Sequence, residues 1–232
     1  MTNSPVFCAL DTADTEHAME LARKLKGNIA GLKIGLEYFM ANGPLSFRSF
    51  AELGMPIFLD VKLHDIPNTV KGAITSLLPL EPDFITIHTS GGPAMMKAAA
   101  QAAAQAKGKR PKLLGVTVLT SLDSDDLAKV GQDTDSTAQA KRLALLAKES
   151  GLDGIICSPA EAKTLREACG PDFILMVPGI RPSWAATGDQ KRITTPKDAI
   201  EAGATYLVIG RPITGAEDPV EAAQKIAEEL EG

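Results

Sequence analysis

The chain has few cysteines, few aromatic residues and no long apolar run. Its 232 residues include three cysteines, Cys8, Cys157 and Cys169, which are far apart and form no CxxC pair. This argues against a disulfide framework and against a cysteine-based metal or redox site, and it suits a reducing cytosol. No run approaches the roughly 18 apolar residues of a membrane-spanning helix, and the first residues lack the basic start of a signal peptide. We expect a cytoplasmic protein that is not embedded in a membrane.

Charge of one sign is not concentrated in any part of the sequence. The 24 Lys and Arg residues against 29 Asp and Glu residues give a formal net charge of −5. Neither nucleic acid nor an anionic membrane is therefore an expected partner. The fractions of hydrophobic residues (44%) and charged residues (23%) exclude collagen-like, coiled-coil and disordered chains. We expect a single domain over residues 1–232, and the composition alone indicates no chemistry.

What the chain does contain is a regular alternation of strand-like and helix-like segments. Dividing 232 residues by eight apolar runs gives a mean spacing of about 29 residues, enough for a strand, a helix and two short loops. The segments between the runs carry helix-start signals such as Asp14, Thr195-Pro196 and Asp218-Pro219. The eight runs, each of strand length, are Val6–Asp11, Gly31–Leu36, Ile57–Leu63, Phe84–Ser90, Leu113–Thr120, Gly154–Ser158, Phe173–Ile180 and Tyr206–Gly210.

This alternation predicts a parallel sheet with right-handed crossovers. Eight such units close into an α/β fold of the (β/α)₈ TIM-barrel type. An open doubly wound sheet is the alternative, but it usually has a glycine-rich turn after its first strand. Here that turn is Asp11-Thr12-Ala13-Asp14, so we predict the barrel. The acidic stretch Asp123–Asp135 is interpreted as an irregular connection before a helix over Ser136–Ser150.

Charged side chains occupy the predicted interior of the barrel. The alternation of residues along a strand directs Asp60 and Lys62 to the lumen, and the same pattern directs Asp11, Lys33 and His88 inward. All five positions lie near the C-terminal ends of their strands, where barrel enzymes have their active sites. Because a buried charge costs several kcal/mol and even a paired cluster rarely improves stability, acids and amines alternating around one mouth indicate a functional site. His88 alone is ambiguous, because a hydrogen-bonded core histidine is commoner than a catalytic one.

Two arginines follow the seventh and eighth runs, where barrels usually bind phosphate. Arg181 lies in the segment Val177-Pro178-Gly179-Ile180-Arg181-Pro182, and Arg211 follows Gly210. Glycine lets the backbone approach an anion, and each guanidinium offers a fork of donors. We therefore expect a phosphate monoester ligand. The polar loop Ser183–Arg192 is a candidate lid over that site.

The segment Asp60–Thr69, with the sequence DVKLHDIPNT, resembles the signature of the orotidine 5′-phosphate decarboxylase family. The signature alone is shared with a wider group of barrel enzymes, but further segments match the family in order. They are Leu10-Asp11, Lys33, Val118–Ser121, Pro178–Arg181, Gln190 and Gly210–Pro212. The resemblance implies a homodimeric barrel that converts orotidine 5′-monophosphate to uridine 5′-monophosphate and CO₂ in pyrimidine biosynthesis, without a metal ion or an organic cofactor.

The resemblance also implies a role for each matching residue. Lys62 would donate the proton to C6 of the pyrimidine, and Asp60 would lie beside the carboxylate that leaves. Asp65, together with Ile66 and Thr69, would reach into the site of the neighbouring subunit. Lys62, Asp60, Asp65 and Lys33 would form the catalytic set. The substrate-binding residues would be Asp11 and Lys33 at the ribose, Thr120 at the pyrimidine amide, Arg181, Gln190, Gly210 and Arg211 at the phosphate, and also Asp60, Ile66, Thr69 and Pro178.

Three other functions stay open. Sugar-phosphate decarboxylases and aldolases of the wider group resemble the chain at DxKxxD but use Mg²⁺ and carry a carboxylate where Lys33 stands, and an ammonium there would repel the cation. A Schiff-base aldolase needs a neutral lysine, whereas Asp60 favours the ammonium form of its neighbour. A non-catalytic phosphate-binding barrel would bind uridine monophosphate and leave orotidine monophosphate unchanged.

Overall fold

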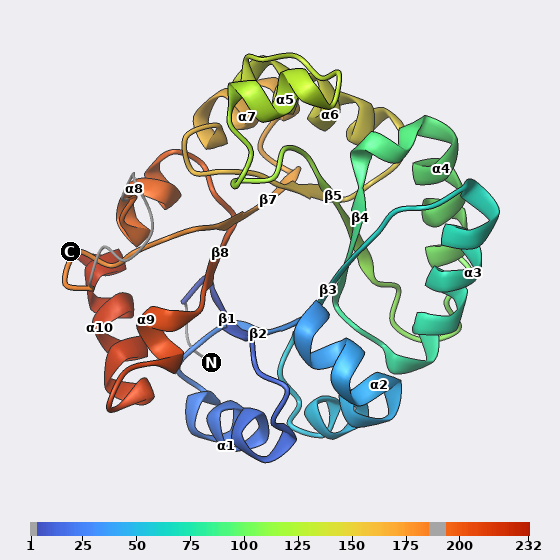
Figure 1. Ribbon diagram of the computed structural model, residues 1–232. Coiled ribbons are helices and arrows are strands. Elements are labelled where there is room, and N and C mark those ends of the chain that lie inside the picture. The colour runs from blue at the N-terminus through green and yellow to red at the C-terminus, as the bar shows by residue number, and fades with distance from the viewer. Residues whose placement is uncertain (1–3, 186–193) are drawn as a thin grey trace.

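The eight predicted strands form one closed, parallel barrel (Figure 1). This computed structural model describes residues 4–185 and 194–232. Each strand pairs with the next along the chain, and the last pairs with the first, so the predicted (β/α)₈ fold class is confirmed. The strands are β1 (Val6–Leu10), β2 (Gly31–Gly35), β3 (Ile57–Leu63), β4 (Phe84–His88), β5 (Lys112–Val116), β6 (Gly154–Ile156), β7 (Ile174–Pro178) and β8 (Tyr206–Ile209).

Helices surround the barrel on its outer side, as Figure 1 shows. Their predicted caps at Asp14, Thr195 and Asp218 are confirmed, since each side chain accepts a hydrogen bond from a backbone N–H of the first turn. No helix in the described ranges has the length and apolar character needed to cross a lipid bilayer. The helices are α1 (Thr15–Leu25), α2 (Leu36–Ala51), α3 (Pro67–Leu77), α4 (Gly92–Ala103), α5 (Ser124–Lys129), α6 (Ser136–Glu149), α7 (Ala162–Cys169), α8 (Pro196–Glu201), α9 (Arg211–Thr214) and α10 (Pro219–Glu231), with 3₁₀ turns η1 (Leu78–Leu80) and η2 (Thr89–Gly91).

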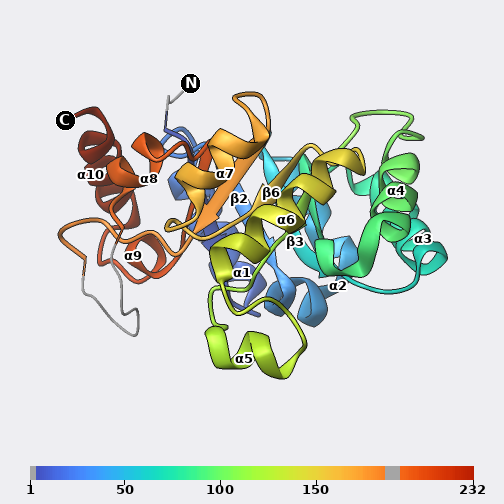
Figure 2. The ribbon, with the colours of Figure 1, turned by 90° about the horizontal axis from the view of Figure 1, so that it is seen from above.

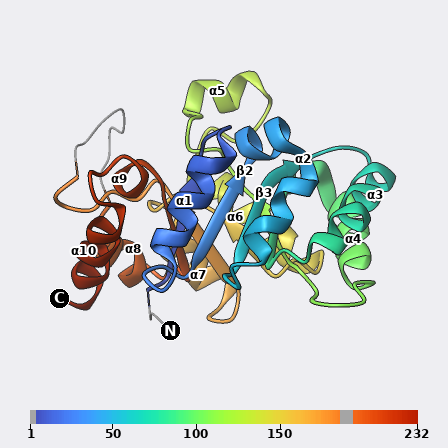
Figure 3. The same ribbon diagram turned by 90° about the horizontal axis from the view of Figure 1, so that it is seen from below.

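The prediction of an irregular connection over Asp123–Asp135 is wrong in part, because α5 lies within it. The Asp123 side chain caps this helix by accepting a hydrogen bond of 3.0 Å from the Asp126 N–H, and Leu127 is fully buried. Six residues are too few to show a helical period in the sequence. Figure 3 shows α5 projecting beyond the end of the barrel toward which the β2 arrow points. Figure 2 shows the C-terminus at the opposite end.

Two apolar layers alternate along each strand, as the sequence pattern predicts. On β1, Cys8 and Leu10 belong to the core between sheet and helices, whereas Phe7 belongs to a smaller cluster inside the lumen. Within the lumen, aromatic rings meet edge to face with centroids 5.4–6.3 Å apart, a favoured aromatic geometry. The rings belong to Phe7, Phe58, Phe84 and Tyr206. All four come from the first two residues of their strands, so this aromatic plug fills the N-terminal half of the barrel.

The ladder between β3 and β4 is interrupted by a bulge. Leu59 pairs with Ile85 and Leu63 pairs with Ile87, so three residues of β3 lie opposite the single residue Thr86. Lys62 is within the bulge and has a φ of 47°, in the left-handed region that residues other than glycine adopt rarely. Bulges re-aim side chains and occur often beside active sites. The bulge therefore places Lys62 in a backbone conformation that strict strand alternation does not predict.

Candidate active site

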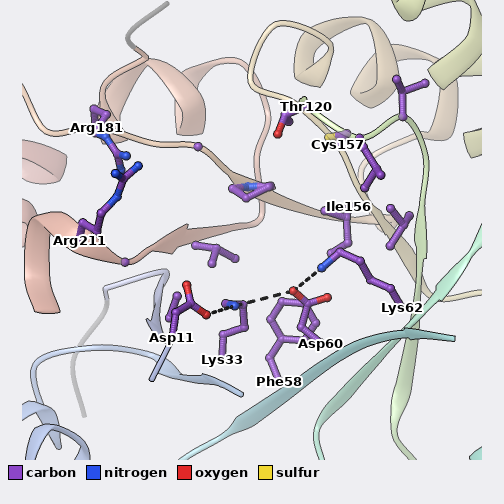
Figure 4. Close-up of a pocket in the computed structure, with 18 residues that line it drawn as sticks. Asp11, Lys33, Phe58, Asp60, Lys62, Thr120, Ile156, Cys157, Arg181 and Arg211 are labelled. Carbon is purple, nitrogen blue, oxygen red and sulfur yellow. Dashed lines mark hydrogen bonds and ion pairs between the residues drawn. The ribbon is translucent and has the colours of Figure 1, made fainter. Parts of the chain in front are cut away.

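A cavity of about 320 Å³ opens at the C-terminal ends of the strands (Figure 4). It lies above the aromatic plug, with Phe58 in its floor. The prediction that charged strand ends meet at one mouth is confirmed for Asp11, Lys33, Asp60 and Lys62, and it is wrong for His88, which is not in the cavity lining that the described residues form. The predicted site residues that line the cavity are Asp11, Lys33, Asp60, Lys62, Thr120, Pro178, Arg181, Gly210 and Arg211.

Four charged side chains form a continuous series along one wall of the cavity (Figure 4). Lys33 Nζ lies 2.8 Å from Asp11 Oδ1 and 3.9 Å from Asp60 Oδ2, and Lys62 Nζ lies 2.7 Å from that same Asp60 oxygen. Asp60 and Lys33 are buried, with residue exposures of 8% and 9%. Because each ammonium faces a carboxylate, the cost of burying the charges is partly offset. We name this series of ion pairs, Asp11–Lys33–Asp60–Lys62, the charged row.

A glycine on β2 allows this charged row to form. Gly35 pairs with Asp60 across the β2–β3 ladder. A Cβ on Gly35 would lie only 2.9 Å from Lys33 Nζ and 3.2 Å from Asp11 Oδ1. Any other residue at this position would therefore displace the Lys33 ammonium. The sequence signal, a glycine inside a strand, indicates close approach of another group but does not say which one.

The two predicted arginines lie on the other side of the cavity. Figure 4 shows the Arg181 and Arg211 side chains pointing toward one another, away from Lys62. Arg181 is buried, and its backbone N–H donates to the Thr194 carbonyl over 3.1 Å. Arg211 is the first residue of α9, directly after Gly210. Two guanidinium groups that converge at one point favour a bound anion between or beside them.

The chain is similar to proteins of known name. Residues 4–226 match the Orotidine 5'-phosphate decarboxylase / HUMPS family. The chain belongs to this family. It is 51% identical over 231 residues to the orotidine 5′-phosphate decarboxylase of Paramagnetospirillum magneticum, covering 98% of each chain. It is 49% identical over 237 residues to that of Rhodospirillum rubrum, covering 100% of this chain and 96% of the relative.

A solved structure of another family member has the same fold. The orotidine 5′-phosphate decarboxylase of Lactobacillus acidophilus superposes with a TM-score of 0.88 at 39% identity, covering 99% of this chain and 100% of the other. The resemblance expected from the sequence segments is thereby confirmed for the whole chain and not only for the Asp60–Thr69 segment. A (β/α)₈ barrel of the orotidine 5′-phosphate decarboxylase family thus carries the charged row and the two arginines at its mouth.

Three predicted site residues of this family member lie in the segment after β3 and outside the cavity lining that the described residues form. Asp65, Ile66 and Thr69 are exposed, and Ile66 has 67% of its surface accessible to solvent. Asp65 Oδ1 accepts a hydrogen bond of 2.6 Å from the Ile66 N–H. Exposure at this edge is compatible with service to a neighbouring subunit, and that role stays a prediction. Gln190 and most of the Ser183–Arg192 loop lie outside the described residues, so their predicted roles also stay predictions.

His88 ends β4 but is not among the described residues that line the cavity. Its ring is half-buried, with its centroid 5.3 Å from that of His64, which follows β3. Burial lowers the pKa of His88 below its usual range, the nearby His64 and Lys62 lower it further, and Asp60 acts in the opposite direction. The imidazole is therefore neutral near pH 7 and adds no charge to the wall.

The sequence patterns missed Thr86 and Cys157 as parts of the site. Thr86 is fully buried and hydrogen-bonds both Asp60 and Lys62. Cys157 lines the cavity beside Ile156, and burial, with a smaller contribution from Glu161, raises the pKa of its thiol. A protonated thiol is a poor nucleophile, so Cys157 contributes shape and not covalent chemistry. In the described part of the chain, no three His, Cys, Asp or Glu side chains are grouped to hold a metal ion.

Proposed function

We propose that the chain decarboxylates orotidine 5′-monophosphate to uridine 5′-monophosphate and CO₂, a step of pyrimidine biosynthesis. Its relatives carry the name of this activity. The observation that supports it most is the position of the Lys62 ammonium, held 2.7 Å from Asp60 inside a cavity whose opposite side carries Arg181 and Arg211. A nucleotide has its phosphate remote from the pyrimidine, and the cavity has cations at both ends.

In the proposed reaction, the bond between C6 and the carboxylate carbon breaks and the electron pair stays on C6. The resulting carbanion lies in the plane of the ring, where the ring cannot delocalise it, so the barrier is high. The Lys62 ammonium stabilises the developing negative charge electrostatically and then gives a proton to C6. CO₂ leaves, and Lys62 regains its proton from solvent. Asp60 holds the Lys62 side chain in the cavity through an ion pair of 2.7 Å.

The remaining site residues are proposed to bind the substrate. Arg181, Gly210, Arg211 and, by resemblance, Gln190 hold the phosphate, while Asp11 and Lys33 bind ribose hydroxyls and Thr120 contacts the pyrimidine amide, next to Pro178. Binding energy from the remote phosphate then supports the chemistry at C6, because it fixes the nucleotide against Lys62. The mechanism requires no metal ion or organic cofactor, since Lys62 supplies both charge and proton.

The family description also includes HUMPS enzymes, and Lys33 distinguishes the proposed reaction from Mg²⁺-dependent sugar-phosphate chemistry. The Lys33 ammonium already lies between Asp11 and Asp60, at 2.8 Å and 3.9 Å from their carboxylate oxygens. A divalent cation at these oxygens would be repelled by the ammonium. This favours the decarboxylation of a nucleotide over the alternatives.

The proposed activity is tested directly with purified protein, orotidine monophosphate and EDTA. We expect the ultraviolet absorbance of the substrate to fall and one equivalent of uridine monophosphate to appear, at a rate that the chelator does not change. Loss of the rate in EDTA would indicate the metal-dependent alternative. Binding of uridine monophosphate with no consumption of orotidine monophosphate would indicate a non-catalytic barrel.

We also propose a homodimer that works in the cytoplasm, with Asp65, Ile66 and Thr69 contributed across the interface. The exposure of all three residues supports the interface, and the three free, buried cysteines support a reducing compartment. Each site would then combine Lys62 of one chain with Asp65 of the other.

Mixing two inactive variants tests this arrangement. After Lys62→Ala and Asp65→Ala proteins are unfolded and refolded together, half of the dimers are mixed, and one of the two sites in each mixed dimer has neither substitution. We expect the mixture to recover about a quarter of the wild-type specific activity. If Asp65 served its own chain, every site would carry a substitution and mixing would restore nothing. The separately refolded variants provide the baseline.

A further inference from the structure

The hydroxyl of Thr86 joins Asp60 and Lys62, the last two residues of the charged row. Its O–H donates a hydrogen bond to Asp60 Oδ1 over 2.9 Å, and its oxygen accepts one from the backbone N–H of Lys62 over 2.8 Å. The side chain is fully buried. Both bonds are therefore formed away from water, where an unpaired group is costly.

The position of Thr86 explains why a side chain makes these bonds. Thr86 is the single β4 residue opposite the β3 bulge, where the regular backbone ladder between the strands is interrupted. Lys62 has its left-handed φ of 47° at this point, so its N–H meets the Thr86 side-chain oxygen. The hydroxyl thus holds the bulged backbone that carries the Lys62 side chain into the cavity.

The same hydroxyl gives the two carboxylate oxygens of Asp60 different partners. Oδ1 accepts the hydrogen bond from the Thr86 hydroxyl, and Oδ2 faces Lys62 Nζ at 2.7 Å and Lys33 Nζ at 3.9 Å. A hydroxyl has one proton to donate, and the acidic acceptor fixes its direction toward Asp60. The oxygen lone pairs are then available to the Lys62 N–H. One group therefore sets both the rotation of the carboxylate and the backbone of the lysine.

We propose that Thr86 is a positioning residue for decarboxylation, which keeps Lys62 Nζ and the Asp60 carboxylate in fixed relation at C6 of the pyrimidine. This inference rests on the proposed function. It predicts a loss of kcat with little change in nucleotide binding, because the phosphate and ribose contacts come from other elements. Thr86→Val keeps the shape of the side chain and removes the hydroxyl, and Thr86→Ser keeps the hydroxyl.

Thr89→Val is the matched control. Thr89 is also fully buried, directly after the same strand as the first residue of η2, and its hydroxyl donates to the Val116 carbonyl over 2.7 Å, outside the charged row. We expect Thr86→Val to lower kcat by about 100-fold, since a misplacement of about 1 Å has this effect. We expect Thr86→Ser and Thr89→Val to stay within about fivefold of the wild type, and all variants to bind uridine monophosphate within about threefold of its affinity.

Two results would overturn the inference. One is a Thr86→Val enzyme with kcat close to wild type, and the other is an equal loss in Thr89→Val, which would reveal a general packing effect. Hydrogen exchange of the Lys62 amide is a measurement that needs neither activity nor a folded Thr86→Val protein. In the wild type it should exchange as slowly as the ladder amides of β3, and exchange at the rate of an open loop would also refute the contact. If the wild type did not consume orotidine monophosphate, the proposed function would fail while slow exchange still confirmed the Thr86 contact.

Discussion

Replacing Lys62 with alanine is expected to lower kcat for orotidine monophosphate by at least about 10⁴-fold, with the barrel still folded. A positioned general acid contributes about 10²–10⁴-fold and a preorganised charge about 10²–10³-fold, and Lys62 is proposed to supply both. The fold should persist because the removed ammonium lies in the cavity, while Val61 keeps its place in the outer core. Asp60 also keeps the Thr86 hydrogen bond.

The measurement is kcat at saturating substrate, together with circular dichroism and thermal melting. Lys141→Ala is a suitable control. Lys141 is exposed on α6, so this substitution removes one ammonium without changing the cavity. A Lys62→Ala enzyme that kept a tenth or more of the wild-type kcat would have an activation free energy raised by at most about 1.4 kcal/mol. Lys62 would then not be the acid.

Replacing Arg211 with alanine is expected to lower kcat/KM by about 10³-fold, because two charge-assisted hydrogen bonds of about 1.5–3 kcal/mol each would be lost. Soluble guanidinium should restore part of the lost activity by occupying the space that the side chain leaves. The effect should be specific to the phosphate. With orotidine, the nucleoside that lacks this group, wild type and Arg211→Ala should turn over at the same low rate.

Orotidine therefore serves as the internal control for Arg211, and Arg142→Ala as the control variant. Arg142 is exposed on α6 and pairs with Asp133 at 2.9 Å. Neither residue lines the cavity or has a proposed role in the site. If Arg211→Ala slowed orotidine as much as orotidine monophosphate, the arginine would act on the pyrimidine end or on folding. Unchanged activity toward both substrates would reject a phosphate contact.

Much of the fold was predictable because strand alternation has a period of two and is locally encoded. The same alternation separated Asp60 and Lys62 from the outward-facing Val61, and the strand-end rule of barrels placed Arg181 and Arg211 at one mouth. These are consequences of where residues fall along a strand. They do not depend on the details of side-chain packing.

The parts that were missed depend on contacts between segments far apart in the sequence. The value of Gly35 lies in the space it leaves for Lys33, and that of Thr86 in a bulge on the adjacent strand. Neither relation has a local period or a local cap. Helix α5 was missed for a different reason, since a six-residue helix shows its cap at Asp123 but too few turns to show an apolar stripe. The placement of Asp65 across an interface requires a second chain and came from resemblance alone.

The aromatic plug also decides how the products leave. Phe7, Phe58, Phe84 and Tyr206 close the lumen below Lys62 with interlocked rings, and the three phenylalanines are at most 5% exposed. Carbon dioxide released at C6 would thus have no passage through the base of the barrel and would depart by the route that admitted the nucleotide. Carbon dioxide and the nucleotide would then share one opening. The rate of product release through this opening would limit turnover once the chemistry is fast.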